Sequence, residues 1–505
     1  MSAAFFASIL ISILTGLFVI RIFSPEPDET GLDWPLAIFL GAGIGTGLSS
    51  LVYFLSMITH STGFIFLIDV LLCVIAGAVF FLRRKRLVPA AAGGTPAIPE
   101  NNRQTTLAKV LLAVFSVEGA ASFAAFIFGF LKEPHGRWDA WLIWNMHARF
   151  LSRSGEGWRD VFSLPMDWSH WDYPLLLPLS IVRGWKYAGT EQIYIPAAFA
   201  FLFFLLTAGL LLFSVSSLRN RPAGLLAAMI LLGTPFFILM GISQFADVPF
   251  SFFILATIVL LFLAKRRQRG SPGLLVLAGM AAALCAWTKN EGFLFVLVAA
   301  IAVFGVSALE KSVKKAPAPL GWFLAGALPV MLIVVYFKIE LAPANDLMAG
   351  FGAGQTAEAK LIDWSRYTMI AKAFFVTGFN FTQGPVDLRA GLMKFNPGLV
   401  SILLPVAWLF FMGASRNGQN RGGIISTAVI LSLMLGGYFL VYLLTPLPLD
   451  YHIATSLNRL FLQLWPSLIF LFFTLSNAPD LGESAGVKTA APAGARPAGQ
   501  KRGRK

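Results

Sequence analysis

The chain has 505 residues, of which 57% are hydrophobic and 13% are charged, and its mean hydropathy is +0.74. Soluble domains carry about a quarter charged residues, so this composition excludes a water-soluble globular protein. The formal net charge is +14, but the basic residues stand in short connectors between apolar runs. That placement excludes nucleic acid as a partner and favours contact with anionic membrane lipid.

Thirteen apolar runs of about 20 residues follow one another along the chain, and each predicts a transmembrane α-helix. Helices are expected because backbone groups in lipid must find their hydrogen-bond partners within the same segment. The short alternating segments of a membrane β-barrel are not seen. The sequence therefore predicts an all-α polytopic fold. The predicted spans lie near residues 3–20, 35–57, 63–82, 107–130, 193–217, 223–243, 248–264, 273–288, 291–308, 319–339, 397–414, 424–444 and 459–476.

The basic residues predict how these spans are oriented. They cluster after every second span, near residues 83–86, 219–221, 265–269, 311–315 and 416–421. All five clusters fall on one side if the helices alternate, and the positive-inside rule makes that side cytoplasmic. The N-terminus is then outside, and the basic C-terminal tail is inside.

Composition divides the chain into three parts. Residues 1–106 hold the N-terminal spans and a cytoplasmic linker, because 88–104 are rich in Ala, Gly and Pro. Residues 107–476 hold the remaining spans and two large outer loops, 131–192 and 341–396. Residues 477–505 form a basic cytoplasmic tail that is expected to be disordered. The two cysteines, Cys73 and Cys285, lie in apolar runs and are expected to be buried, without a disulfide or metal role.

The first outer loop is the most informative segment. Between Lys132 and Gln192 it carries seven basic and seven acidic residues, which suggests a folded polar surface. Trp138, Trp141 and Trp144 recur every three residues at the start of an amphipathic stretch, so we expect a helix lying flat at the interface, for which the tryptophans serve at least as anchors. Asp139 stands among them, where an idle carboxylate costs free energy.

Two further carboxylates lie close to membrane boundaries. Asp172 precedes Tyr173 and Pro174, and it either caps the next helix or contributes to a site. Asp247 stands in the tight link between two spans, with Pro249 two residues later. It is either only an N-cap or a site residue, because a lone carboxylate in an apolar hairpin is a candidate for function.

Cations and histidines accompany these carboxylates on the predicted outer side. Lys289 and Glu291 lie between two spans and either pair only with each other or join a site. Arg459 opens the last predicted span, and a cation there requires an anionic partner. His147 and His452 are weaker candidates for the same cavity. Together these residues fit an acceptor hydroxyl meeting a phosphate-linked donor, since a carboxylate can accept the hydroxyl proton and Lys or Arg can hold the phosphate.

Five segments resemble the GT-C superfamily of integral-membrane glycosyltransferases. They are WDAWLIWNMHARFL from Trp138, DYPLLLP from Asp172, FADVP from Phe245, WTKNEG from Trp287 and TSLNRLFLQLWP from Thr455. The resemblance covers roughly residues 107–476 and is strongest to bacterial members akin to protein O-mannosyltransferases and to the lipid A aminoarabinose transferase. Three spans precede the helix that leads into the first loop, which departs from the family pattern and leaves those spans without a role.

The resemblance implies a periplasmic active site in the bacterial inner membrane and a polyprenyl-phosphate-linked sugar as donor. It implies that Asp139 is the catalytic base, that Asp247 is the second catalytic carboxylate, and that Lys289 and Arg459 lie near the lipid phosphate. A large soluble C-terminal domain, present in some members, is absent here, so the acceptor can be a lipid, a glycan or a protein.

The sequence thus predicts an inverting hexosyl- or pentosyltransferase. Asp139 and Asp247 are the predicted catalytic residues; the predicted substrate-binding residues are Asp172, His147, Lys289, Arg459, His452 and Glu291. No cofactor is predicted, although paired carboxylates can hold a divalent ion. A transporter or lipid flippase is the main alternative, but it should show charged or broken helices at mid-membrane, often in two repeated halves. A non-catalytic scaffold leaves the outer carboxylates unexplained.

Overall fold

The computed structural model describes residues 2–24, 32–87, 106–163, 167–266, 271–310, 312–344, 356–383, 400–415 and 418–478. The described residues are mostly helical, and their only β-structure is an isolated bridge between Ala414 and Ser476. The predicted linker 88–104 and nearly all of the predicted tail 477–505 lie outside the described residues, as do Lys311 and parts of the second outer loop.

Ten described helices are long and apolar enough to cross a membrane. They are α1 (Ala3–Phe23), α3 (Trp34–Ile58), α4 (Ile65–Leu87), α5 (Thr106–Lys132), α8 (Tyr194–Leu218), α11 (Asp247–Arg266), α13 (Glu291–Glu310), α14 (Pro317–Glu340), α19 (Arg421–Leu444) and α20 (Leu449–Leu475). The protein is therefore a multi-pass membrane protein.

Three shorter features complete the set of predicted spans. One is the pair α9 (Arg221–Leu232) and α10 (Pro235–Ile242), which is bent by 64° where Pro235 begins the second helix. The others are the short apolar helices α12 (Pro272–Thr288) and α18 (Leu403–Met412). Each of the thirteen predicted spans thus coincides with an apolar helix or helix pair, and the predicted all-α polytopic fold is confirmed.

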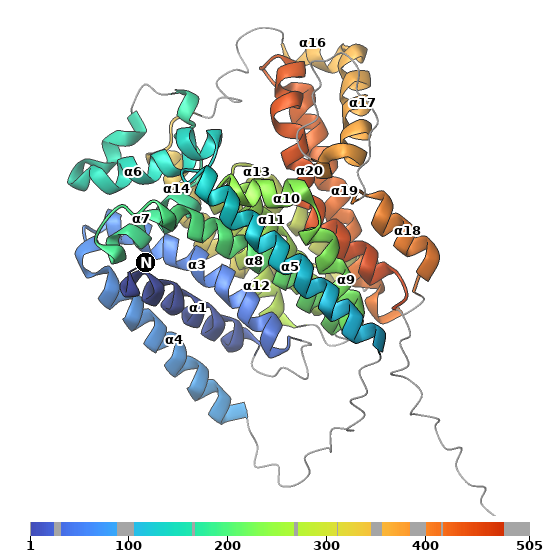
Figure 1. Ribbon diagram of the computed structural model, residues 1–505, viewed down its shortest axis with the longest axis horizontal. Helices are drawn as coiled ribbons and strands as arrows, with labels where there is room; N and C mark the ends of the chain where they lie inside the picture. Colours follow the sequence, from blue (N-terminus) through green and yellow to red (C-terminus); the bar gives the residue numbers. More distant parts are fainter. Residues whose placement is uncertain are drawn as a thin grey trace, which may run out of the picture.

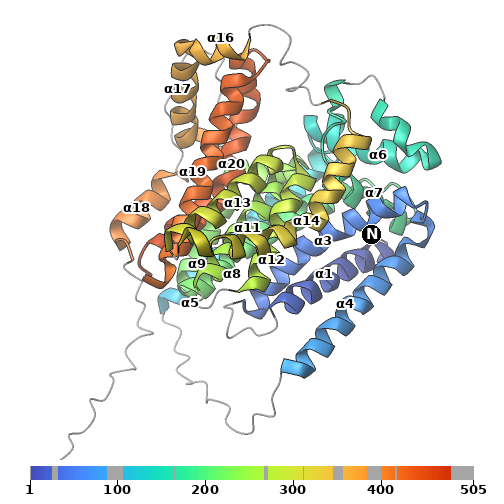
Figure 2. The same ribbon diagram turned by 180° about the vertical axis from the view of Figure 1, so that it is seen from behind.

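The centre of the bundle is α11, whose residues from Asp247 to Ala264 are all buried. It packs against α8, α12, α19 and α20, so that protein surrounds it on all sides (Figures 1 and 2). A helix enclosed in this way can be apolar around its whole circumference. Its first residue, Asp247, is consequently a carboxylate that protein encloses.

The N-terminal helices α1, α3 and α4 form a layer beside this centre (Figure 1). α1 and α3 approach closely at Gly16. A Cβ atom there would lie 1.9 Å from the carbonyl oxygen of Gly41, so only glycine allows this contact. Small residues at such a contact are the usual means of packing helices in lipid. α3 in turn contacts α7 (Leu176–Ala188) and α8, so the layer is joined to the rest of the bundle.

The first outer loop folds into short helices at one end of the molecule. A π-helical turn (Ala140–Trp144) leads into α6 (Asn145–Arg153) and the 3-10 segment Gly155–Ser163. In the second loop, α16 (Ala357–Ile362) is followed by α17 (Trp364–Asn380), a helix that the sequence did not predict. Figure 1 shows α6 and α16 at one end of the bundle and the C-terminal end of α4 at the other. The first of these is called the outer end below, after the orientation predicted from the sequence.

Two local predictions are wrong. Trp138 and Trp141 are exposed as expected of anchors, but Trp144 is fully buried, because the π-helical turn removes the regular spacing on which the predicted stripe depends. The last span begins at Leu449 and not near residue 459. Arg459 therefore lies nearly three turns inside α20 and does not open it.

Candidate active site

Asp247 is the best-connected carboxylate among the described residues. Its side chain is 0% exposed and accepts four hydrogen bonds: from Lys289 Nζ (3.0 Å), Arg459 Nε (3.0 Å), Arg459 Nη2 (2.8 Å) and Gln463 Nε2 (2.7 Å). A buried carboxylate is stable only when it is paired and hydrogen-bonded in this way. The interpretation of Asp247 as only an N-cap is therefore wrong.

Arg459 joins Asp247 to the first outer loop. Its Nη1 lies 2.7 Å from Asp139 Oδ2, while Nε and Nη2 contact Asp247. The guanidinium also lies over the Phe245 ring, with Cζ 4.9 Å from the ring centroid. The fixed fork of an arginine suits it to hold two carboxylates at once. Residues 139, 247 and 459 are thus brought together from three distant parts of the chain.

Lys289 and Glu291 form the second half of this network. α12 ends at Thr288, Lys289 is extended, and α13 begins at Glu291, so both side chains start at a sharp change of direction. Lys289 Nζ lies 3.0 Å from Glu291 Oε1 as well as from Asp247. Burial alone would lower the pKa of Lys289, but the charges of Asp247 and Glu291 outweigh it and raise that pKa above its ordinary value. The predicted Lys289–Glu291 pair exists, and it belongs to a larger site.

A second cluster surrounds Asp172. The N-cap of α7 is Leu175, so the capping interpretation of Asp172 is wrong. Its Oδ2 instead accepts from Asn290 Nδ2 (2.6 Å) and lies 3.6 Å from Lys338 Nζ, which also donates to Asn290 Oδ1 (2.6 Å) and to the backbone oxygen of Asp172. Since Asn290 stands between Lys289 and Glu291, the two clusters are neighbours.

Tyr173 lies between these clusters. Burial raises the pKa of its hydroxyl well above the ordinary value, and the charges of Glu291, Asp172 and Asp139 raise it further, against the opposing effect of Arg459. Its ring packs against Trp144, with centroids 5.6 Å apart. The Tyr173 hydroxyl is therefore a neutral group beside these charges.

Backbone and amide contacts hold the Asp139 loop against the Asp247 link. Gln244 has a left-handed backbone (φ 58°), and its side chain accepts from Asn145 Nδ2 (2.9 Å) and donates to the Pro134 oxygen (3.0 Å). Gly136 also has positive φ (+74°), and a Cβ there would lie 2.7 Å from the Ser243 oxygen. Only glycine fits such a close approach in this conformation. These contacts hold the segment that carries Asp139 against the link that carries Asp247.

The two histidines lie outside the ion network. His147 is fully buried: its Nε2 contacts the Ser169 backbone oxygen (2.8 Å) and its ring stacks on Trp171 at 3.9 Å. Burial lowers its pKa to about 3. His452 lies near the start of α20, with Nδ1 2.9 Å from Thr445 Oγ1. The structure thus brings Asp139, Asp247, Lys289, Glu291 and Arg459 together, with Asp172 in the adjoining cluster.

Four polar residues of the site were not predicted from the sequence: Gln244, Asn290, Lys338 and Gln463. Lys338 had a usable signal, because it lies inside an apolar helix, where a cation requires a partner. Gln463 follows Arg459 by four residues, which places both on one helix face. Gln244 and Asn290 carry no such signal. A metal centre has no candidate among the described residues, where no group of three or more His, Cys, Asp or Glu side chains is suitably placed.

Comparison with protein families gives a match over residues 188–337, to the family described as dolichyl-phosphate-mannose-protein mannosyltransferase. The matched segment is under a third of the chain and contains Asp247, Lys289 and Glu291. This partial match supports a membrane glycosyltransferase of the GT-C type. Comparisons with curated proteins and with solved structures gave no match.

Several residues of the candidate site lie outside the matched segment. Asp139 and Asp172 precede it and Arg459 follows it, but direct contacts join them to residues within it. Arg459 contacts Asp247, and Asp172 contacts Asn290. The site therefore combines the family-like centre of the chain with side chains from both flanking regions.

Proposed function

We propose that this glycosyltransferase moves a sugar from a polyprenyl-phosphate donor to an acceptor hydroxyl, with inversion, at the periplasmic face of a bacterial inner membrane. The observation that carries the proposal is the position of Arg459. It contacts a partly exposed carboxylate, Asp139, and a fully buried one, Asp247, beside a second buried cation, Lys289. This arrangement places a proton acceptor next to two cations suited to a phosphate.

The two cations retain donors for the phosphate of the sugar donor. A lysine has three N–H donors and an arginine five. Lys289 uses one on Asp247 and one on Glu291, and Arg459 uses two on Asp247 and one on Asp139. One N–H on Lys289 and two on Arg459 therefore remain. They support binding of the donor phosphate and of the negative charge that grows on it as the sugar leaves.

Asp139 is the proposed general base. Its side chain is 17% exposed, so an acceptor can reach it, whereas Asp247 is completely enclosed. Asp139 accepts the hydroxyl proton while the acceptor oxygen forms a bond to the anomeric carbon. The bond from that carbon to the phosphate oxygen breaks, and its electron pair remains on the polyprenyl phosphate. A single displacement of this kind inverts the anomeric centre.

Asp247 takes a positioning role in this scheme and not the catalytic contact predicted from sequence. All four of its hydrogen bonds go to protein groups, and they fix the directions of Lys289 and Arg459. Asp172, with Asn290 and Lys338, offers polar groups for sugar hydroxyls. Neither histidine is needed for proton transfer. No step requires a metal ion, so the prediction of a metal-independent reaction is retained.

The test is sugar transfer by the purified protein from radiolabelled polyprenyl-phosphate mannose to a detergent extract of the cell envelope. Wild-type protein should transfer label, and Asp139→Asn should transfer at least about a thousandfold more slowly, because it has lost the base and the charge beside Arg459. Asp160→Asn is the matched control, since Asp160 is an exposed carboxylate of the same loop. Turnover by Asp139→Asn at the control's rate would show that this carboxylate is not the base.

A further inference from the structure

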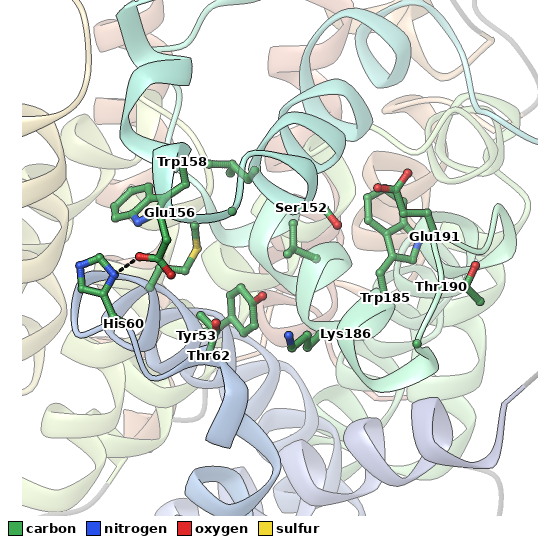
Figure 3. Close-up of a pocket in the computed structure, with 15 residues that line it drawn as sticks. Tyr53, His60, Thr62, Ser152, Glu156, Trp158, Trp185, Lys186, Thr190 and Glu191 are labelled. Carbon is green, nitrogen blue, oxygen red and sulfur yellow. Dashed lines mark hydrogen bonds and ion pairs between the residues drawn. The ribbon is translucent and has the colours of Figure 1, made fainter.

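A pocket of about 480 Å³ opens at the outer end, apart from the ion network. One wall comes from the N-terminal layer, through Tyr53 and Met57 of α3 and through His60 and Thr62 of the α3–α4 link. The other wall comes from the first outer loop and α7, including Trp158 and Trp185. Figure 3 shows His60 and Glu156 at one end of the pocket, Thr190 and Glu191 at the other, and Tyr53 and Lys186 between them. None of the charged residues of the candidate active site lines it.

The pocket wall combines aromatic rings with short polar groups. Trp158, Trp185 and Tyr53 supply rings, while Ser152, Thr62 and Thr190 supply hydroxyls. Its two carboxylates already have basic partners: Glu156 contacts His60, and Glu191 accepts from Arg153 at 2.6 Å. The site is therefore not strongly charged. Apolar faces with a few oriented polar groups are typical of pockets for small polar ligands, and a saccharide presents both apolar C–H faces and hydroxyls.

Two polar side chains in the pocket have no protein partner. The Tyr53 side chain is buried, at 5% exposure, yet no described residue hydrogen-bonds to its hydroxyl. Lys186 is exposed, and it likewise lacks an ion pair among the described residues. The Tyr53 hydroxyl is not among the fully enclosed polar atoms that lack a partner, so it opens to the pocket, where a ligand hydroxyl can bond to it. Figure 3 shows both side chains within the same hollow.

Next to the pocket, buried contacts join the N-terminal layer to α7. Arg183 of α7 and Asp69 of α4 form a buried ion pair (2.8 Å), and Tyr187 also donates to Asp69 (2.6 Å). Arg183 further donates to the Ser8 oxygen of α1 (3.2 Å). These contacts tie α7, which contributes to one wall, to the helices of the N-terminal layer. They also give the three N-terminal helices, which the family resemblance left unexplained, a structural part in this pocket.

We propose that this pocket binds a saccharide portion of the acceptor. The proposal rests on the proposed glycosyltransferase function and names its acceptor class as a glycan or a glycan-bearing lipid. α6 connects the two places, because Ser152 lines the pocket thirteen residues after Asp139. At about 1.5 Å per residue in α6, and less over the π-helical turn before it, the separation is at most about 20 Å, a length suited to an oligosaccharide held at one end and reacting at the other.

The first variants change only the pocket. Tyr53→Phe removes a hydroxyl that no described residue uses, so folding should be unaffected and glycan affinity should fall roughly two- to tenfold. Thr190→Trp places an indole at the rim and should lower affinity more than about tenfold. Tyr451→Phe and Ser163→Trp are the matched controls, because they alter exposed positions that do not line the pocket.

Binding is measured with an array of defined short oligosaccharides. The probe is full-length protein in lipid nanodiscs, displayed multivalently on streptavidin-coated beads so that avidity reveals weak binding. The proposal predicts that wild type and both controls bind a subset of the glycans, that Tyr53→Phe binds it less, and that Thr190→Trp loses it. Thermal unfolding of each variant confirms that the protein is folded.

Three results would overturn the inference: no glycan bound by wild type, binding unchanged in both pocket variants, or selective binding to serine- and threonine-containing peptides on a parallel array. The assay does not use the donor, so it is independent of the proposed reaction. If mannose transfer requires Asp139 but is unchanged in the pocket variants, only the proposed role of the pocket is contradicted. If the protein binds glycans but transfers no sugar from the donor, the proposed function is contradicted.

Discussion

Replacing Asp247 by Asn tests the buried network most severely. The substitution keeps the shape of the side chain but removes the charge that faces Lys289 and Arg459. Lys289 is 5% exposed and Asp247 is 0% exposed, so solvent screens their pair very little, while Arg459 at 19% is screened somewhat more. Leaving a buried charge without its partner costs about 3–5 kcal/mol. Because Glu291 and Asp139 still face the two cations, we expect Asp247→Asn to lower the free energy of unfolding by at most about this amount.

A double-mutant cycle then isolates the Lys289 contribution. Asp247→Asn leaves Lys289 with Glu291 as its one remaining ion-pair partner among the described residues, and Lys289→Met removes that cation. The double variant should therefore lose less stability than the two single losses added together, by about 1–3 kcal/mol. Unfolding of purified protein is followed by circular dichroism during titration with sodium dodecyl sulfate. The control cycle uses Arg153→Met and Glu191→Gln, whose side chains are 68% and 25% exposed. That surface pair should couple by less than about 1 kcal/mol.

The coupling energy between Asp247 and Lys289 decides whether the two side chains interact in the folded protein. If the losses at Asp247 and Lys289 were additive within about 0.3 kcal/mol, the two side chains would not interact in the folded protein. The positioning role of Asp247 would then be wrong. Equal coupling energies in the buried and surface cycles would contradict the burial of the Asp247–Lys289 pair.

Three further predictions concern stability. Burial lowers the pKa of His147 to about 3 from 6.5, so between these pH values the unfolded chain binds a proton that the folded protein does not. The free energy of unfolding should therefore fall as the pH drops below about 6.5, by up to about 1.4 kcal/mol per pH unit. The fall should be shallower in His147→Gln. Gly136→Ala should lower the free energy of unfolding by at least about 1–2 kcal/mol, because of its positive φ and the nearby Ser243 oxygen. Gly63→Ala, where a Cβ meets no atom within 4 Å, should be nearly neutral. Equal melting temperatures of the two variants would refute this prediction. Asp69→Asn should cost about 3–5 kcal/mol by leaving the Arg183 guanidinium buried without its partner, and an unchanged unfolding midpoint would contradict the buried ion pair next to the pocket.

Sequence reasoning succeeded for features set by local composition. Each apolar run became a helix or a bent helix pair, because lipid offers no other way to satisfy the backbone. Asp139, Asp247, Lys289 and Arg459 could be grouped because an ionisable side chain near lipid requires a partner, and their contacts confirm that grouping. The general rule identified which residues must be paired, although it could not say which partner each would choose.

Features that depend on three-dimensional contact were missed. The depth of Arg459 in α20 was misjudged because His452 and Asn458 interrupt the apolar pattern, while burial against neighbouring helices keeps the segment helical. Trp144 was misassigned because a single π-helical turn changes which residues share a face. The pocket at the outer end could not be found at all, since Tyr53, Trp158 and Lys186 come from three separate segments with no shared sequence pattern.

The most direct test of the central claim is a cryo-electron microscopy map of the protein bound to a non-hydrolysable polyprenyl-phosphate sugar. The account predicts that the phosphate contacts Lys289 and Arg459 and that the anomeric carbon faces Asp139. A phosphate at the opposite end of the bundle, or a sugar separated from Asp139 by an intact protein wall, would contradict it.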